Sequence, residues 1–595
     1  MTVGGTRPDV SRVIFVLVDA LRADHVGWYA GRDVGTPTFD RLASRGVVFA
    51  NAISQAPATR GSVSSVFTGF YPSQHGLVDR AREDDRGEAS VAGLDKGVPT
   101  LAELLAADGH VTAAFVAGNA NLRPVFGLTR GFLHVDYLPT TDGSVLVDRF
   151  ERFVEAGPPG RAFCYLHFME LHHPLPMEIP SRLDQGLDLD TVEESMGQLV
   201  EYYAAAARLV DQHIGRVVGA LEAARMFDDA LIILTADHGE EHLEHGAMLA
   251  HGRTLYRELV HVPLIMKLPD GASAGTVVDQ PVQLIDLMPT ILDAAGCPRT
   301  DLAGRSLLPA IRGEGGDASL AFSELLRRDR YCQSATSSTH QLIVSYLLEE
   351  SAAVSLADLR PGVTVKLKGQ LTQGGSLLPT KLALTSKESV TLRGTVDAVD
   401  GKTGSLTVLG VPFRTDRTTS WVGLEEEPIE PSTLGVGQRL SATLVEASDG
   451  GYLAVKIQQR KPGGKSKIVG PIQRVADLEA DFRLVTVLGT EIAVGSNLLR
   501  TAKHQGKIFD HRKSDALTRV LQADHVGREV ELYDLAADPL QARNIVDKRP
   551  DIAQELEAQL AAWTEQLMTG SRVSAAGIDV DPETLEQLRR MGYLE

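Results

Sequence analysis

The feature that most constrains the fold is a regular alternation of short apolar runs and longer amphipathic stretches over residues 12–350. The apolar runs are VIFVLVD, TAAFVAG, RAFCYLHF and ALIILTADHG, which begin at residues 13, 112, 161 and 230. Between them lie helical patterns such as TFDRLASRG, TLAELLAADG and a long one over residues 196–226. Apolar strands that alternate with helices indicate a mostly parallel sheet covered on both faces. We therefore expect an α/β domain over residues 1–350.

The pattern changes over residues 355–510, where helical periodicity gives way to alternation with glycine turns, as in VTLRGTVDAVDGKTGSLTVLGVPF. A weak tandem repeat is visible: LRGTVDAVD with TVLG at 407–410 is followed by IVGPIQRVA with TVLG at 486–489. KPGGKSK at 461–467 reads as the linker between the copies. Short strands with this spacing predict one or two small all-β barrels or sandwiches. Because helical patterning returns over 511–595, we expect the β-rich module to be an insertion.

The overall composition excludes several classes of protein. The chain has 595 residues, which is too long for one core, and its formal net charge is −19. That charge disfavours nucleic acid as a partner, since affinity for its backbone depends on clustered Lys and Arg. The three cysteines form neither a disulfide framework nor a CxxC zinc site. We see no signal peptide and no transmembrane segment, and so expect a cytoplasmic protein.

Polar side chains are placed where the predicted strands end, namely Asp19, Asn119, His167 and Asp237. The carboxyl edge of such a sheet is where α/β folds place their sites. Asp19 alone would usually be a helix N-cap. Asp237 and His238 end an apolar strand within LTADHGEEHLEHG, and an adjacent carboxylate and imidazole are typical of a divalent metal site. The alternative for this stretch is a solvated acidic loop.

Residues 55–69, QAPATRGSVSSVFTG, allow two interpretations from their pattern. A polar step followed by small and apolar residues is typical of a helix N-terminus that binds phosphate. The same letters describe an ordinary capped helix, and the pattern alone leaves both open.

Five segments in this order resemble the sulfatase family of the alkaline phosphatase superfamily: DALRADH, APATRGSVSSVFTGFYPSQHG, HFMELHHP, LTADHGEEHLEHG and HGRTLYRELVHVPLIMK. The resemblance resumes at GREVELYDLAADPLQARNI and LRRMGYLE. It implies an alkaline-phosphatase-like fold with a large central mixed sheet and a smaller C-terminal subdomain. Residues 1–350 would be the catalytic domain, 355–510 the inserted module, and 511–595 the segment that completes the fold.

The resemblance implies one divalent metal ion beside the nucleophile. Its ligands would be Asp19, Asp237 and His238, with the hydroxyl of Thr59 completing the set. Many sulfatases have a second aspartate directly after the first, where this chain has Ala20. The remaining Asp–His form is more similar to the phosphonate and phosphodiester hydrolase branch. It makes Mg, Mn or Zn better candidates than Ca.

The nucleophile position departs from the family pattern. Most sulfatases carry CxPxR or SxPxR, whose first residue is oxidised to formylglycine. Here that position is Thr59, with Gly61 and Val63 where proline and arginine would be. Formylglycine is an aldehyde, and threonine, a secondary alcohol, cannot give one. Thr59 would act instead as an alkoxide whose pKa is lowered by the metal, at the start of a helix expected near Ser62.

The resemblance assigns further roles around this centre. His172 matches the substrate-side histidine of the family, and His251 lies near its catalytic Lys or His and would protonate the leaving oxygen. Asn119 would donate to a transferring oxygen or simply form a turn. Arg60 would clamp an anionic substrate or face solvent. Thr59 could also be only a helix cap, with Ser62 as the fallback nucleophile.

Two further histidines, His242 and His245, are candidates for a second metal, which we do not expect to bind. His167 is as easily a packed strand residue as a ligand.

These observations predict a sulfatase-family, metal-dependent hydrolase that cleaves phosphate, phosphonate or sulfate esters, including phosphodiesters, through Thr59. Its substrate would be a small or glycan-linked anionic ester. Two alternatives are a phosphotransferase that uses an acceptor alcohol, and a non-catalytic scaffold that presents the β module. The metal ligands count against the scaffold.

Overall fold

The structure is a computed structural model of the chain. It describes residues 10–77, 89–158, 160–172, 189–242, 248–314, 320–327, 330–347 and 527–569, shorter stretches at 82–83, 244–245, 576–578, 580–581, 583–584 and 587–588, and the strands and some turns between 364 and 495.

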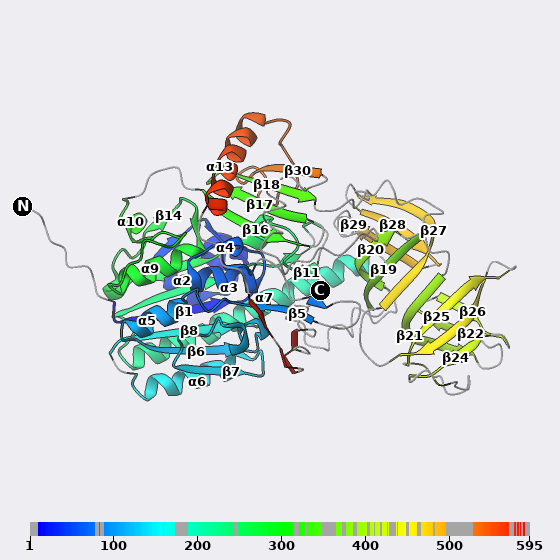
Figure 1. The fold of residues 1–595 in the computed structure, drawn as a ribbon, viewed down its shortest axis with the longest axis horizontal. Coiled ribbons are helices and arrows are strands. Elements are labelled where there is room, and N and C mark those ends of the chain that lie inside the picture. The colour runs from blue at the N-terminus through cyan, green and yellow to red at the C-terminus, as the bar shows by residue number, and fades with distance from the viewer. Residues whose placement is uncertain are drawn as a thin grey trace, which may run out of the picture.

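Eight strands form the central sheet, in the order β14, β2, β13, β9, β1, β8, β6, β7 (Figure 1). They are β1 (Arg12–Val18), β2 (Val47–Phe49), β6 (Val111–Ala117), β7 (His134–Leu138), β8 (Ala162–Phe168), β9 (Ala230–Ala236), β13 (Leu264–Lys267) and β14 (Val277–Val278). Neighbouring strands run parallel except where β13 pairs with β9 and with β2. The predicted mixed, mostly parallel sheet is thus confirmed. The four apolar runs of the sequence form four adjacent strands of this sheet, β9, β1, β8 and β6.

Helices cover both faces of this sheet. One layer consists of α2 (Pro37–Arg45), α6 (Gly143–Glu155) and α7 (Leu189–Ala223), in which α2 and α6 each pack against α7. The other contains α3 (Thr59–Thr68), α5 (Leu101–Ala107) and α9 (Leu287–Ala294). Aromatic side chains fill both interfaces: Phe115 of β6 packs on Phe150 of α6, and Tyr165 of β8 packs on Phe67 of α3. A strand apolar on both faces is what two helical layers require.

The remaining elements of the α/β region are short. The helices are α1 (Gly27–Ala30), α4 (Pro72–His75), α8 (Arg257–Val260), α10 (Leu308–Ile311) and the 3-10 turns η1 (Ala23–His25), η2 (Ala120–Leu122), η3 (Pro124–Phe126), η4 (Pro269–Gly271) and η5 (Leu284–Asp286). The strands are β3 (Ala52–Ile53), β4 (Arg82–Glu83), β5 (Ala89–Gly93), β10 (Glu241–His242), β11 (Met248–Ala250), β12 (His261–Val262), β15 (Val282–Gln283) and β31 (Ala576–Ile578).

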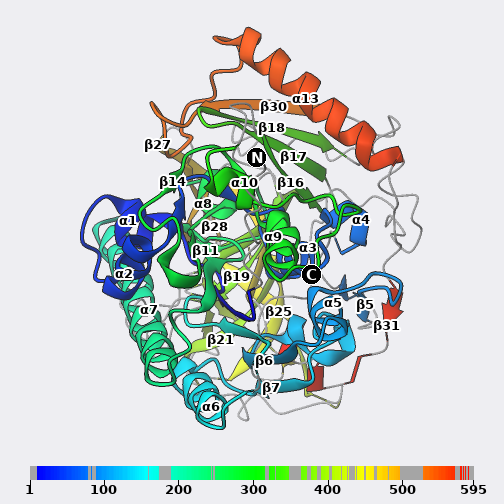
Figure 2. The same cartoon turned by 90° about the vertical axis from the view of Figure 1, so that its left-hand side faces the viewer.

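A second, antiparallel sheet carries the helix α13 (Pro550–Thr569), which lies across it in Figure 2. Its strands are β16 (Ala321–Leu326), β17 (Arg330–Thr336), β18 (His340–Leu347) and β30 (Gly527–Asp534). Trp563 of α13 stacks on Phe322 of β16, with ring centroids 4.8 Å apart. Because β18 pairs with β30 along its whole length, the chain leaves this sheet at Leu347 and returns to it at Gly527.

The strands between these two points lie to one side of the α/β sheet (Figure 1). They are β19 (Thr364–Leu371), β20 (Leu377–Leu384), β21 (Val390–Asp400), β22 (Ser405–Val408), β23 (Val411–Arg414), β24 (Ser420–Val422), β25 (Arg439–Glu446), β26 (Tyr452–Gln459), β27 (Ser466–Glu479), β28 (Phe482–Val487) and β29 (Thr490–Gly495). The pairings β21–β22–β23–β26–β25–β21 close a five-stranded barrel. A barrel-like β module was expected here.

The two copies of the sequence repeat have the same strand arrangement. In each, a long strand pairs with the first arm of a hairpin: β21 with β22–β23, and β27 with β28–β29. Each hairpin turns at a leucine with positive φ, Leu409 at 57° and Leu488 at 54°. Of the expected linker, residues 461–465 lie outside the described residues, and Ser466 and Lys467 begin β27. The domain boundaries themselves stay predictions.

No helix in the described part of the chain combines the length and apolar character that a membrane crossing requires.

Candidate active site

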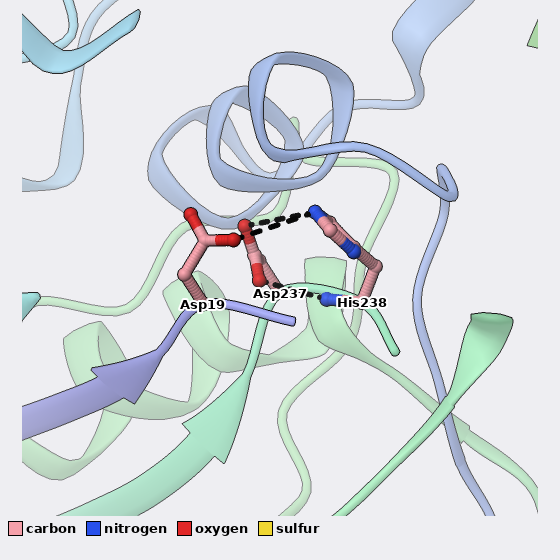
Figure 3. Close-up of side chains that lie close together, drawn as sticks. All are labelled: Asp19, Asp237 and His238. Carbon is pink, nitrogen blue, oxygen red and sulfur yellow. Dashed lines mark hydrogen bonds and ion pairs between the residues drawn. The ribbon is translucent and has the colours of Figure 1, made fainter. Parts of the chain in front are cut away.

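The candidate site is assembled at the carboxyl edge of the central sheet. Asp19 directly follows β1, and Asp237 and His238 directly follow the adjacent parallel strand β9. Parallel pairing puts both strand ends at one edge, so the three side chains converge there (Figure 3). All three are fully buried. The solvated-loop interpretation of Asp237–His238 is therefore wrong.

Two carboxylate oxygens at this site have no hydrogen-bond partner. They are Asp19 Oδ1 and Asp237 Oδ2, which lie 3.8 and 3.6 Å from His238 Nε2. His238 Nδ1 lies 2.8 Å from the Gly239 carbonyl oxygen, which can only accept, so Nδ1 carries the proton and Nε2 presents a lone pair. Three donor atoms thus face one another, all within 4.8 Å. That spacing fits ligands around one ion, with bonds of about 2.0–2.5 Å.

Thr59 completes this group of donors. Its Oγ1 lies 3.1 Å from Asp19 Oδ2 and 3.3 Å from His238 Nε2. The helix α3 begins at Thr59 itself, three residues earlier than the expected start near Ser62. Nothing in the Thr59 side chain caps the helix, because the N-cap residue is Ala58. The fallback nucleophile Ser62 instead donates to the Asp237 carbonyl oxygen at 2.7 Å, as a structural hydrogen bond.

The other oxygen of Asp19 is held by neighbours. Asn119 Nδ2 donates to Asp19 Oδ2 at 2.7 Å, and His167 Nε2 lies 3.2 Å from the same atom. Asp19 is thus no helix N-cap. His167 lies within β8, not after it, and its Nδ1 bonds the Tyr165 hydroxyl at 2.7 Å. Asn119 follows β6, and its Oδ1 accepts from the Asn121 amide, so its side chain orients a carboxylate in this structure.

The two aspartates are held in different electrostatic environments. Burial by itself raises the pKa of Asp19, but the charge of His172 and a hydrogen bond from His167 hold that pKa well below its usual value. Burial, and then the nearby charge of Asp19, raise the pKa of Asp237. A divalent cation would offset the repulsion between these two carboxylates.

Two predicted catalytic histidines lie beside these donors. The His251 ring lies 4.4 Å from the His238 ring and 5.0 Å from the His172 ring, between centroids. Both are almost fully buried. His251 Nδ1 lies 3.1 Å from Glu240 Oε2, so the carboxylate accepts from it.

Glu240 was missed in the sequence. It is fully buried, two residues after His238 in DHGE, although a run of acidic and histidine residues suggests exposure. The signal was its position two residues after His238, from which only Gly239 separates it. Gly239 is required because a Cβ there would meet the Glu258 carbonyl oxygen at 2.0 Å.

Arg60 does not face solvent, so that expectation is wrong, while its role as a clamp for an anionic substrate stays a prediction. Its side chain is buried, its guanidinium donates to the Ala92 carbonyl oxygen, and it lies 5.8 Å from the Phe126 ring centroid. A charged residue adjacent to the nucleophile position can still point away, because residues i and i+1 of a helix diverge by about 100°.

His245 belongs to a second group of possible ligands, with Glu241 and Glu258. Its Nδ1 lies 2.7 Å from Glu258 Oε1 and its Nε2 3.2 Å from the Gln541 carbonyl oxygen. Burial lowers the pKa of His245, but the hydrogen bond to Glu258 outweighs it and the pKa is raised. Both nitrogens face acceptors, so the ring has no lone pair for a metal.

The other candidate, His242, is not in this group; its ring packs on Tyr203 with centroids 4.6 Å apart.

Comparison with known proteins gives this geometry a context. Residues 11–297 match the family described as Sulfatase, and residues 393–458 match a domain of unknown function (DUF5666). Arylsulfatase K of Danio rerio is 31% identical over 148 residues, 25% of this chain and 27% of that protein. The chain therefore spans about a quarter of the length of this curated relative.

Two longer similarities cover more of the chain. The Delta 4,5-hexuronate-2-O-sulfatase of Bacteroides thetaiotaomicron is 25% identical over 51% of this chain and 72% of that protein. The crystal structure of the phosphonate monoester hydrolase of Agrobacterium radiobacter matches 94% of this chain and 96% of that chain, with 16% identity and a TM-score of 0.50. The latter shows a shared fold.

Proposed function

We propose that the chain, whose residues 11–297 form a sulfatase-family domain, is a metal-dependent hydrolase of phosphate, phosphonate or sulfate esters with Thr59 as its nucleophile. One observation carries the proposal: the Thr59 hydroxyl, at the first position of α3, lies within hydrogen-bond distance of both Asp19 and His238. A reactive hydroxyl that touches two metal-ligand side chains has no evident structural purpose there.

The residues of this site fit a divalent ion. The unpartnered atoms Asp19 Oδ1 and Asp237 Oδ2, with His238 Nε2, would hold it, and Thr59 Oγ1 lies beside them. Hard oxygen donors and one imidazole suit Mg, Mn, Ca or Zn. When bound, such an ion lowers the pKa of a coordinated hydroxyl and offsets the charge of an anionic ester.

The chain's own groups then account for the reaction. Thr59 attacks as the alkoxide, having released its proton to water; a bond forms from Oγ1 to phosphorus or sulfur, and the bond to the leaving oxygen breaks. His251 protonates that oxygen, and Glu240 fixes the ring by accepting from Nδ1. Neutral His251 next takes a proton from a water molecule, which cleaves the threonine ester and returns Thr59 as the alkoxide. The N–H groups of the first turn of α3 would donate to the transferred oxygens.

The test is an ester panel: aryl phosphate, phosphodiester, phosphonate and sulfate, each with Mg, Mn, Ca or Zn. We expect Thr59→Ala to lower kcat about 10³-fold or more, and Thr59→Ser to keep measurable activity. Thr68→Ala is the matched control, since it removes a hydroxyl from the same helix. Within the described part of the chain, that hydroxyl bonds only the Ser64 carbonyl and the Phe70 amide. Equal activity of wild type and Thr59→Ala would refute the nucleophile. If none of the esters is cleaved, the scaffold alternative is favoured. If the phosphoryl group is transferred to an added alcohol, the phosphotransferase alternative is favoured.

A further inference from the structure

The β module differs in charge from the rest of the chain. Residues 355–510 contain 20 Lys and Arg against 16 Asp and Glu, a net charge of +4, so the remaining residues carry −23. A local excess of positive charge in an acidic protein indicates a surface for an anion.

Strand register places four cations of this module together. Arg393 of β21 is opposite Lys467 of β27 on one side and Ser441 of β25 on the other. Arg439 of β25 is opposite Thr395, two residues along β21. The Arg460 amide, directly after β26, donates to the Arg439 carbonyl oxygen at 2.8 Å. We call Arg393, Arg439, Arg460 and Lys467 the basic face.

Alternation along the strands directs these side chains away from the barrel core. On β21 the buried residues are Leu392 and Val396, with Arg393 and Thr395 half-buried on the other side. Leu440 of β25 and Ile468 of β27 are likewise buried beside their outward-facing neighbours. Because side chains alternate with period 2, the cations share the outer face, with strands about 4.8 Å apart.

Two arginines of this face have unused hydrogen-bonding capacity. The Nε atoms of Arg393 and Arg460 are buried and have no hydrogen-bond partner, and among the described residues neither side chain forms an ion pair. Among the side chains that the structure describes, Arg460 donates to Gln458 Oε1 alone, at 2.6 Å. Burial, and then the charge of Arg460, lower the pKa of Arg393; burial, and then Arg393, lower that of Arg439. Clustered, half-buried guanidinium groups cost free energy that a bound anion would offset.

We propose that the basic face binds the sulfate groups of a sulfated polysaccharide. Guanidinium groups bind sulfate-type oxyanions through two parallel hydrogen bonds, while Ser441, Thr395 and Gln458 in the same rows offer hydroxyl and amide partners for a sugar. These rows contain no aromatic side chain on which a nucleic-acid base could stack. The choice of a sulfated glycan rests on the proposed ester hydrolase function, for which the module would retain a polymeric substrate.

The test uses the full-length chain with Thr59→Ala, so that binding is measured without turnover. The probes are dextran sulfate, unsulfated dextran, duplex DNA and vesicles with about 30% anionic lipid. We expect binding to dextran sulfate alone, and about tenfold or greater loss of affinity in Arg393→Gln/Arg460→Gln, with the slope of log Kd against log salt reduced by about two. Arg414→Gln is the matched control, since it removes an exposed arginine from β23 on the far side of the barrel.

The outcomes separate this proposal from the proposed function. If the protein does not bind dextran sulfate, or if Arg414→Gln loses as much affinity for it as the double variant, the basic face is not the binding site. Tighter binding of DNA or vesicles would overturn the glycan as its ligand. A failure of the ester panel leaves these binding results unchanged, because they do not depend on catalysis.

Discussion

Asp19 is the residue on which the candidate site converges. One of its oxygens is held by Thr59, Asn119 and His167, which leaves the other directed at His238. A carboxylate fixed on one side and unpartnered on the other is oriented for a metal. Its neighbour Ala20 has φ of 59°, an uncommon value for alanine, and its amide donates to Asp237 at 3.1 Å. Backbone strain of this kind gathers at functional sites.

Loss of the Asn119 amide should weaken metal binding. Asn119→Ala removes the 2.7 Å hydrogen bond that orients Asp19. We expect metal affinity to fall by about 10- to 100-fold, as measured by competition with a chelating dye, while saturating metal restores most of kcat. If Asn119 acts on substrate instead, kcat stays low at saturating metal and the dye titration does not change.

The proposed role of His251 as general acid predicts that its loss affects alkyl and aryl leaving groups differently. His251→Ala should lower kcat by about 10²–10⁴-fold for an alkyl ester, whose leaving oxygen needs a proton. For a nitrophenyl ester, which leaves without one, the loss should be much smaller. Equal losses on both esters would assign His251 a role other than proton donation.

The sequence predicted much of this site and missed parts of it for physical reasons. Asp19, Asp237 and His238 were predictable because strand ends of a parallel sheet meet at one edge. Glu240 was not, because a charged run reads as solvated unless tertiary packing covers it. The orientation of the Arg60 side chain could not be predicted from sequence, since it depends on Ala92 and Phe126, which the fold brings beside it.

At the scale of elements, the loop after β9 is held by close backbone contact. The Gly239 amide donates to the Leu259 carbonyl oxygen at 2.9 Å, and the Glu258 carbonyl oxygen fills the space where a Cβ would be. This contact fixes the stretch that carries Asp237, His238 and Glu240. The positions of these three side chains therefore depend on one backbone contact.

Gly239→Ala should displace this stretch. A Cβ at 2.0 Å from the Glu258 oxygen forces the backbone apart, and we expect a loss of about 1–3 kcal/mol in the free energy of unfolding together with weaker metal binding. Gly219→Ala in α7 is the matched control: its Cβ meets nothing within 4 Å, so it should be neutral or stabilise by up to about 1 kcal/mol. Thermal unfolding of both variants decides the matter. If Gly239→Ala is as stable as wild type and binds metal as tightly, the backbone around the Glu258 carbonyl oxygen can accommodate a Cβ at position 239.

Element prediction succeeded where periodicity was strong. The four apolar runs became β1, β6, β8 and β9. The start of α3 was misplaced by three residues, because Thr59 and Arg60 carry no apolar periodicity and the helix is buried on all sides. A small barrel was expected in the inserted module, but the pairing order that closes it, β21–β22–β23–β26–β25, was not predicted, since long-range pairing leaves no local pattern.

At the scale of the whole molecule, buried neutral histidines make stability depend on pH. His75 is fully buried between Ser65 Oγ at 3.1 Å and the Leu77 amide at 3.2 Å. Burial, first, lowers its pKa to about 3. In the unfolded chain the pKa is about 6.5. Below that pH, His75 is protonated in the unfolded state but stays neutral in the folded state.

Stability should therefore fall as the pH drops from 7 towards 3. At pH 5 His75 alone should cost about 2 kcal/mol relative to pH 7 or above, since each pKa unit corresponds to about 1.4 kcal/mol. His75→Gln should be less stable at pH 7 but lose less on acidification. Tm measured from pH 7.5 to 5 tests this, and parallel curves for the two proteins would contradict the assignment.

The central claim, that Thr59 is the nucleophile, is tested most directly by trapping the covalent intermediate. The protein would be loaded with the best metal, mixed with its best aryl ester, quenched in acid during turnover, digested, and the peptide containing Thr59 and Ser62 fragmented by mass spectrometry. The account predicts a phosphoryl or sulfuryl group on Thr59, absent from Thr59→Ala and from protein without substrate. Modification of Ser62, or turnover with no modified Thr59 at any quench time, would contradict it.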